Sequence, residues 1–341
     1  MAVSRKRALA ALKGFVSLAL LAWVLHSAVA RDGVGVLGAR VASLDLSALA
    51  LAALLHFASV GLGVLRWDVL LRARGLVLRG AFLARSYLIG RFAAAFTPST
   101  AGLDVVRAIE VGRATGRPAV SASVVAVEKA VGVLGLACVC AALAVGGGDV
   151  LARGPALGVA ALAALGALCG LAVLARPGRL APFLRVLPAG LRARATRVID
   201  ALPAGGLGPS TLLRAVALGL AGHLCVSAVF VATGRAVGVP VSAATLLVVG
   251  NAIVVATLLP ISISGVGVRE GVAVVLLARV GVSATDATLV ALLGYLSGQL
   301  PALLGGLLTL VPAPSPSVAR SDERPTPDDA SASPCLSPRQ L

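Results

Sequence analysis

Six stretches of this chain are apolar over a length that few water-soluble folds could bury. A transmembrane α-helix needs about 20 consecutive, mainly apolar residues, and these stretches have that length. They cover roughly residues 10–30, 46–65, 119–147, 154–175, 212–234 and 287–311. The whole chain is 58% hydrophobic and 13% charged, whereas soluble domains average about 45–50% and about 25%. The sequence therefore predicts an all-α, polytopic membrane protein with about six spanning helices.

Two further stretches are apolar but interrupted. Residues 81–118 carry Arg85, Arg91, Pro98, Asp104 and Arg107. Residues 241–280 carry Asn251, Pro260, Arg269 and Glu270. Each stretch is too long for one span and too broken for two. Because non-helical backbone at membrane depth must be buried in protein or reached by water, each stretch fits a re-entrant helical hairpin.

The basic residues predict an orientation, because cytoplasmic loops carry an excess of Lys and Arg. With the N-terminus inside and both hairpins re-entrant, fifteen basic residues fall in the inner segments 1–13, 66–80 and 176–214. Four fall in the outer segments 31–45, 146–155 and 235–240. We therefore expect both termini inside, with residues 312–341 as a disordered cytoplasmic tail. The alternative for the N-terminus, a cleavable signal peptide ending near Ala30, would leave the later topology unchanged.

The two broken stretches align with each other at an offset of 162 residues. This offset places Pro98 on Pro260 and Arg107 on Arg269, and the flanking spans follow in matching order. Each half, about 10–147 and 154–311, then reads as span, span, hairpin, span, with opposite orientations. The pattern favours an inverted repeat within one transmembrane domain, residues 1–311, as in many secondary transporters.

The charged residues of the hairpins are the candidate binding groups. An arginine at bilayer depth costs about 2.5–3.5 kcal/mol on insertion scales, so it should face a partner or a water-filled cavity. Half-helix N-termini add positive partial charge nearby. We expect a site for a phosphate or carboxylate built from Arg107, Arg269, Asp104, Glu270, Glu128, Lys129, Ser99 and Ser262. The residues expected to shape the hairpins are Pro98, Gly102, Pro260, Gly265 and Gly267.

A structural alternative stays open for these charges. Arg107 with Asp104, and Arg269 with Glu270, could hold the hairpins in place without touching a ligand, although recurrence in both halves favours binding. His56 and His223 are interpreted as buried polar contacts. Four of the five cysteines lie inside apolar runs without a second ligand pair, so neither a metal nor another cofactor is predicted.

Three segments carry a resemblance to a known family: PSTAGLDVVRAIEV, VEKAVGVLGL and LLPISISGVGVREGVAV. They resemble the lysylphosphatidylglycerol synthase transmembrane region, a flippase-like family of bacterial membrane proteins, over roughly residues 10–312. The resemblance implies a lipid-translocating domain with paired re-entrant elements in the cytoplasmic membrane. The chain departs from the family pattern at Leu103, Lys129 and Ser264, where glycine, arginine and glycine are expected. The soluble aminoacyl-transferase domain is not found in this sequence, so synthesis of a lysyl-lipid is not expected.

Our first functional expectation is a flippase that moves an anionic phospholipid or lipid-linked headgroup across the membrane. The alternative is a membrane-embedded enzyme, or an accessory factor presenting lipid, that acts on polyprenyl or phospholipid phosphate for envelope glycan synthesis. The first is preferred because the sequence offers no nucleophile–base constellation, so an enzyme is not expected. The net charge of +16 would suit nucleic acid, but only 3% of residues are aromatic and the basic residues lie mainly between spans. The expected partners are membrane lipid and envelope lipid or glycan enzymes, not nucleic acid.

Overall fold

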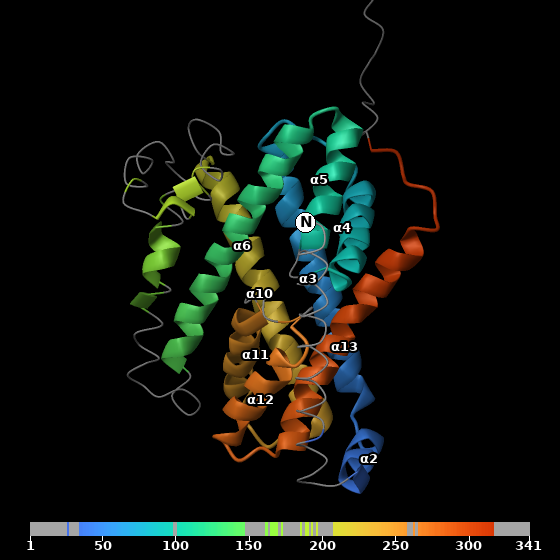
Figure 1. The fold of residues 1–341 in the computed structure, drawn as a ribbon, viewed down its shortest axis with the longest axis vertical. Coiled ribbons are helices and arrows are strands. Elements are labelled where there is room, and N and C mark those ends of the chain that lie inside the picture. The colour runs from blue at the N-terminus through green and yellow to red at the C-terminus, as the bar shows by residue number, and fades with distance from the viewer. Residues whose placement is uncertain are drawn as a thin grey trace, which may run out of the picture.

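The structure, a computed structural model, describes residues 34–97, 101–146, 207–257 and 265–316, together with residues 26 and 262 and scattered residues between 161 and 196. The elements of the continuous ranges are all helices (Figure 1). They are α2 (Val34–Ala42), α3 (Leu46–Arg72), α4 (Gly80–Ala95), α5 (Ala101–Thr115), α6 (Pro118–Gly146), α10 (Pro209–Val237), α11 (Ala243–Thr257), α12 (Val268–Ala278) and α13 (Ala284–Leu308).

Four of the described helices, α3, α6, α10 and α13, are long and apolar enough to cross a membrane. They confirm the helices predicted at 119–147, 212–234 and 287–311 to within a few residues. The helix predicted at 46–65 is longer than expected, because the buried stripe of α3 continues past Arg66 through Trp67, Leu70 and Leu71. The predicted spans at 10–30 and 154–175 lie mostly outside the described residues, and the tail from residue 317 lies wholly outside them.

Local chemistry sets several helix ends. Asp45 caps α3, where its carboxylate accepts hydrogen bonds from the backbone N–H groups of Ser47 and Ala48. Together with the Ser47 hydroxyl, which is the largest contributor, these donors lower the pKa of Asp45. Helix α10 begins with Pro209, which needs no helical donor at this position, and ends before Gly238 in the left-handed conformation, φ 77°.

Helices α3 and α10 pack against each other along the centre of the molecule. The buried residues of α3 recur every three or four positions, the spacing of one helix face, and include Ala48, Ala52, His56, Val60, Gly63 and Trp67. In Figure 1, α3 and α13 run upward along the chain, whereas α6 and α10 run downward. Two of the four long helices therefore run in each direction.

Two pairs of shorter helices fill the space between the long ones. Helices α4 and α5 pack together in the upper half of Figure 1, and α11 and α12 pack together in the lower half. None of these helices exceeds 16 residues, or about 24 Å at 1.5 Å per residue, which is shorter than the roughly 30 Å hydrocarbon core. Each pair occupies one of the interrupted stretches that the sequence singled out.

Glycines shape both short-helix pairs. A Cβ atom on Gly102 would lie 2.6 Å from the carbonyl carbon of Ala93, so α5 can approach α4 only because position 102 lacks a side chain. The Gly102 N–H also donates to the Thr97 hydroxyl across the turn, at 3.0 Å. Gly265 and Gly267, before α12, adopt φ of 74° and 83°, a region that favours glycine.

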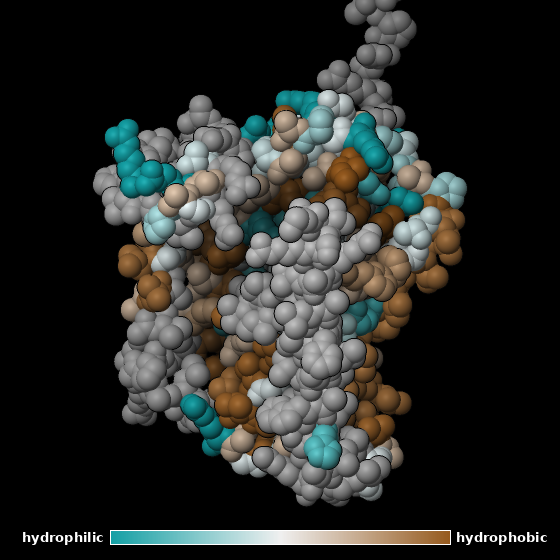
Figure 2. Space-filling view, in the orientation of Figure 1, coloured by the Kyte–Doolittle hydropathy of each residue, from teal (hydrophilic) through white to brown (hydrophobic). Residues whose placement is uncertain are grey.

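The molecule displays large apolar side chains on its outside. Exposed examples occur on every long helix and include Leu54, Leu65, Val133, Leu213, Leu303 and Leu307. Figure 2 shows hydrophobic residues along the body of the molecule and hydrophilic residues gathered mainly at its upper end. This distribution is expected of a surface that faces lipid tails.

Candidate functional site

Arg107 of α5 lies at the centre of a buried group of charges. Its side chain is 2% exposed, and its Nη2 donates to Asp104 Oδ1 at 3.0 Å and to Glu128 Oε2 at 2.9 Å. The guanidinium lies over the rings of Trp67 and Tyr87, 5.1 Å and 4.9 Å from their centroids. A planar guanidinium can stack on aromatic faces while it donates in its own plane. In this conformation Arg107 therefore ties α5 to α3, α4 and α6.

Glu128 of α6 joins Arg107 to a second arginine. Its Oε1 accepts hydrogen bonds from Arg66 of α3, through Nε at 3.0 Å and through Nη2. The remaining edge of the Arg66 guanidinium faces two glycines. A Cβ on Gly219 of α10 would lie 3.3 Å from Arg66 Nη1, and one on Gly132 of α6 would lie 3.6 Å from it. The absence of side chains at these positions makes room for the guanidinium between α6 and α10.

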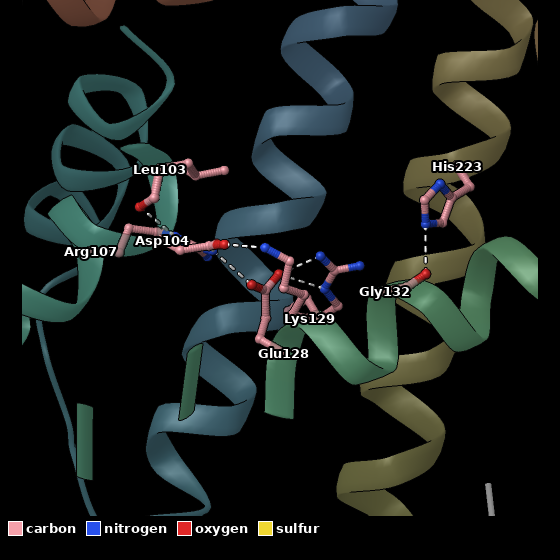
Figure 3. Close-up of polar contacts among 8 residues, drawn as sticks. Leu103, Asp104, Arg107, Glu128, Lys129, Gly132 and His223 are labelled. Carbon is pink, nitrogen blue, oxygen red and sulfur yellow. Dashed lines mark hydrogen bonds and ion pairs between the residues drawn. The ribbon is translucent and has the colours of Figure 1, made fainter. Parts of the chain in front are cut away.

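Asp104 extends the cluster toward the surface. Its Oδ2 accepts from Lys129 of α6, whose side chain is 55% exposed, while that of Asp104 is 19% exposed. Figure 3 shows Asp104 and Arg107 on α5 facing Glu128 and Lys129 on α6. The exposed fraction thus rises stepwise from the buried carboxylate of Glu128 to Lys129.

We call Arg66, Asp104, Arg107, Glu128 and Lys129 the charge cluster. It contains three cationic and two anionic side chains, which leaves one net positive charge. Each carboxylate is shared between two cations. Buried charges are tolerated when they are paired in this way, and the surplus positive charge can attract an anion at the accessible end.

Arg269 and Glu270, at the start of α12, have separate roles. The Arg269 guanidinium lies 4.2 Å from the centroid of the Tyr295 ring of α13. Glu270 is fully buried, and its Oε2 accepts from the Gly267 N–H at 2.6 Å, which caps the helix. A Cβ on Gly265 would lie 3.1 Å from Arg269 Nη2 and 2.6 Å from Thr257. Because Gly265 lacks a side chain, the Arg269 guanidinium can lie beside it.

The family of the chain follows from a comparison of its whole length. The profile described as Lysylphosphatidylglycerol synthase TM region matches residues 11–306. The chain belongs to this family. The match contains the charge cluster, both short-helix pairs and the four long helices except the last two residues of α13, so the resemblance noted in the sequence is confirmed. No curated protein matched the chain in a second comparison.

In this family member the structure brings together only part of the predicted site. Asp104, Arg107, Glu128 and Lys129 form one cluster, whereas Arg269 and Glu270 lie on α12, which packs against α11 and α13. Ser262 is buried, and its hydroxyl has no hydrogen-bond partner among the described residues. Pro98, Ser99 and Pro260 lie outside the described residues.

The histidines are the polar contacts that the sequence suggested. His56 Nδ1 lies 3.1 Å from the Ser297 hydroxyl of α13. His223 Nε2 lies 2.9 Å from the Gly132 carbonyl of α6, as Figure 3 shows. Each histidine therefore links its own long helix to a neighbouring one.

Sequence reasoning missed Arg66 and the aromatic residues. Arg66 was assigned to an inner loop, although it lies within α3 and pairs with Glu128. The sequence did contain a signal for a longer helix, because the apolar residues Val69 and Leu70 continue the helical spacing beyond Arg66. Trp67, Tyr87 and Tyr295 stack on arginines from other helices, and nothing local to these residues indicates that packing.

Proposed function

We propose that this chain translocates the headgroup of an anionic phospholipid or lipid-linked phosphate across the bacterial cytoplasmic membrane. The observation that carries the proposal is the charge cluster, which sets a net positive charge between membrane-spanning helices and opens to the surface at Lys129. A phosphate could replace a carboxylate as the partner of Lys129 while its acyl tails stay in the bilayer. Membership of the family is consistent with this role.

An inverted repeat with two re-entrant hairpins is the architecture we propose for this activity. The helices α3 and α6 run opposite to α10 and α13, respectively, and a short-helix pair follows α3 and α10 in turn (Figure 1). The matching order supports the repeat, and the short lengths of α4, α5, α11 and α12 support the hairpins. Transporters built this way bind their cargo near the repeat interface.

The proposed orientation places both termini in the cytoplasm. It rests on the excess of basic residues in the segments assigned to the inside. Single cysteines at Gly80, the first residue of α4, and at Gly238, just after α10, would test it in a cysteine-free background. An impermeant thiol reagent should label position 238 in intact cells and position 80 only after the membrane is opened. The reverse pattern would overturn the orientation.

Reconstitution tests the transport proposal. Liposomes carrying the purified chain should expose labelled phosphatidylglycerol to an external quencher faster than labelled phosphatidylcholine, which has no net charge. The variant Lys129→Gln should slow the anionic lipid. The control is Arg72→Gln, which neutralises a cation of similar exposure, 53%, that also pairs with a carboxylate, Asp68. Equal rates for the two lipids, or no rate above empty liposomes under any ion gradient, would refute the proposal.

A further inference from the structure

Arg91 of α4 differs in its partners from Arg66, Arg85 and Arg107. Arg66 and Arg107 pair with Glu128, and Arg85 lies 3.9 Å from Glu110. Among the described residues, no carboxylate lies within ion-pair distance of Arg91. Its one printed hydrogen bond runs from Nη2 to the Gly298 carbonyl of α13, at 3.3 Å. Its Nε is shielded from solvent and has no partner among the described residues.

A guanidinium has five N–H donors and a permanent charge. A neutral carbonyl satisfies one donor and none of the charge. An uncompensated cation in the interior of a membrane protein is unfavourable, and such groups usually face a partner or a cavity that a ligand or water occupies. Because no described residue supplies an anion to it, Arg91 has the chemistry of an anion receptor.

The polar groups near Arg91 come from two other helices, α3 and α13. His56 of α3 is buried and its Nδ1 contacts the Ser297 hydroxyl at 3.1 Å. A Cβ on Gly298 would lie 2.9 Å from His56 Nε2, so a glycine is needed where Arg91 and His56 meet α13. Pro301, one turn along α13, cannot donate to the Ser297 carbonyl. Backbone and side-chain polar groups thus converge at this point.

A second arginine contacts the same part of α13. Arg91 donates to the Gly298 carbonyl, and Arg269 lies over the Tyr295 ring. They come from different short-helix pairs, Arg91 from α4 and Arg269 from α12. Arg269 is held over Tyr295, one turn before Gly298 on α13. Guanidinium groups suit phosphate, because their planar N–H groups can donate two parallel hydrogen bonds to its oxygens.

We infer that Arg91, with Arg269, His56 and Ser297, forms a second anion-binding site that receives a phosphate group. This Arg91 site shares no residue with the charge cluster, since its members come from α3, α4, α12 and α13 and none of them belongs to the cluster. As a step in transport it rests on the proposed function, because a headgroup would pass from Lys129 to Arg91 on its way across. As a binding site it stands independently of transport.

Thermal unfolding of the purified full chain in a neutral maltoside detergent tests the inference. The probes are dihexanoyl phosphatidylglycerol, inorganic phosphate and, as the uncharged comparison, dihexanoyl phosphatidylcholine. The measurements use the Lys129→Gln background, in which the charge cluster has no net charge. The anionic lipid should still raise the unfolding temperature, and phosphatidylcholine should not. A shift with inorganic phosphate would show that phosphate alone suffices, whereas a shift with the lipid alone would show that the attached chains contribute.

Arg91→Gln should weaken binding of the anionic probe about tenfold or more, the equivalent of one charge-assisted hydrogen bond. Its unfolding temperature without ligand should not fall, because the substitution removes a partly buried cation that has no carboxylate partner among the described residues. Arg91→Lys should retain part of the binding. The matched control is Arg85→Gln, also on α4, whose side chain donates to the carbonyls of Leu308 and Val311. It should unfold at a lower temperature and keep the ligand shift.

Two results would overturn the inference. The first is a ligand shift that is absent without Lys129, or that survives Arg91→Gln. The second is a ligand-free destabilisation by Arg91→Gln as large as that by Arg85→Gln, which would make Arg91 a structural contact. Failure of the transport proposal is separate. It would appear as anion binding that depends on Arg91 in a protein that moves no lipid in liposomes.

Discussion

Replacing Glu128 by glutamine should be among the most destabilising single changes in the charge cluster. The side chain is 4% exposed and accepts from Arg107 at 2.9 Å and from Arg66 Nε at 3.0 Å. Glutamine keeps one acceptor oxygen but turns an N–H₂ group toward one of the two guanidiniums. Removing one partner of a buried pair costs about 3–5 kcal/mol. Asp104→Asn should cost less, about 1.5–3 kcal/mol, because Asp104 and its partner Lys129 are more exposed.

Reversible unfolding in mixed micelles, titrated with a denaturing detergent and followed by circular dichroism, would measure both values. A double-mutant cycle with Arg66→Gln and Glu128→Gln isolates the pairwise contribution, because the two side chains are in direct contact. We expect a favourable coupling of about 1–3 kcal/mol. Glu128→Gln within about 0.5 kcal/mol of the parent, the range of ordinary surface changes, would show that the pair is not buried as described.

Three further predictions concern packing and capping. Gly102→Ala should destabilise the protein by about 1–3 kcal/mol, since the new Cβ would meet the Ala93 carbonyl at 2.6–2.7 Å. The control is Gly61→Ala on α3, where a Cβ would meet nothing within 4 Å. It should be neutral or stabilising in the same unfolding titration. Tyr295→Leu should lower the unfolding temperature more than Tyr295→Phe, because phenylalanine keeps a ring under Arg269; equal losses would contradict the stacking. The lowered pKa of Asp45 means that its cap on α3 should stabilise fully above about pH 4 and lose this effect as the pH falls through the folded-state pKa. Asp45→Ala should remove that pH dependence from the unfolding midpoint.

The helices could be predicted from the sequence because their signal is local. The apolar runs fix the length of α6, α10 and α13, and the prolines and glycines of the two interrupted stretches mark where short helices replace long ones. The end of α3 was misplaced because Arg66 carries a charge, and a charge after an apolar run is typical of a loop. In this protein Glu128, 62 residues further along, neutralises that charge, so the helix continues.

The partners of the charges could not be predicted in the same way. The spacing of Asp104 and Arg107 on one helix face indicates their contact, and the structure contains it. The stacking of Arg107 on Trp67 and Tyr87 depends on how α3, α4 and α5 pack. The same is true of Arg91, which lies near the end of α4 and meets α13 more than 200 residues later. A single sequence does not show which residues of such distant helices lie opposite each other.

The arginines between the helices of this protein differ in whether a carboxylate neutralises their charge. Arg107 has two carboxylates and two aromatic rings around it, so an added anion would have to displace Glu128 or Asp104 and would gain little. Arg91 has only the Gly298 carbonyl as a described partner, so the proposed anion would meet a guanidinium that no described carboxylate neutralises. The paired arginines link neighbouring helices, and the resulting rigidity would keep Arg91 and Arg269 positioned for that anion. Binding then requires little reorganisation of the protein, which leaves more of the electrostatic energy for affinity.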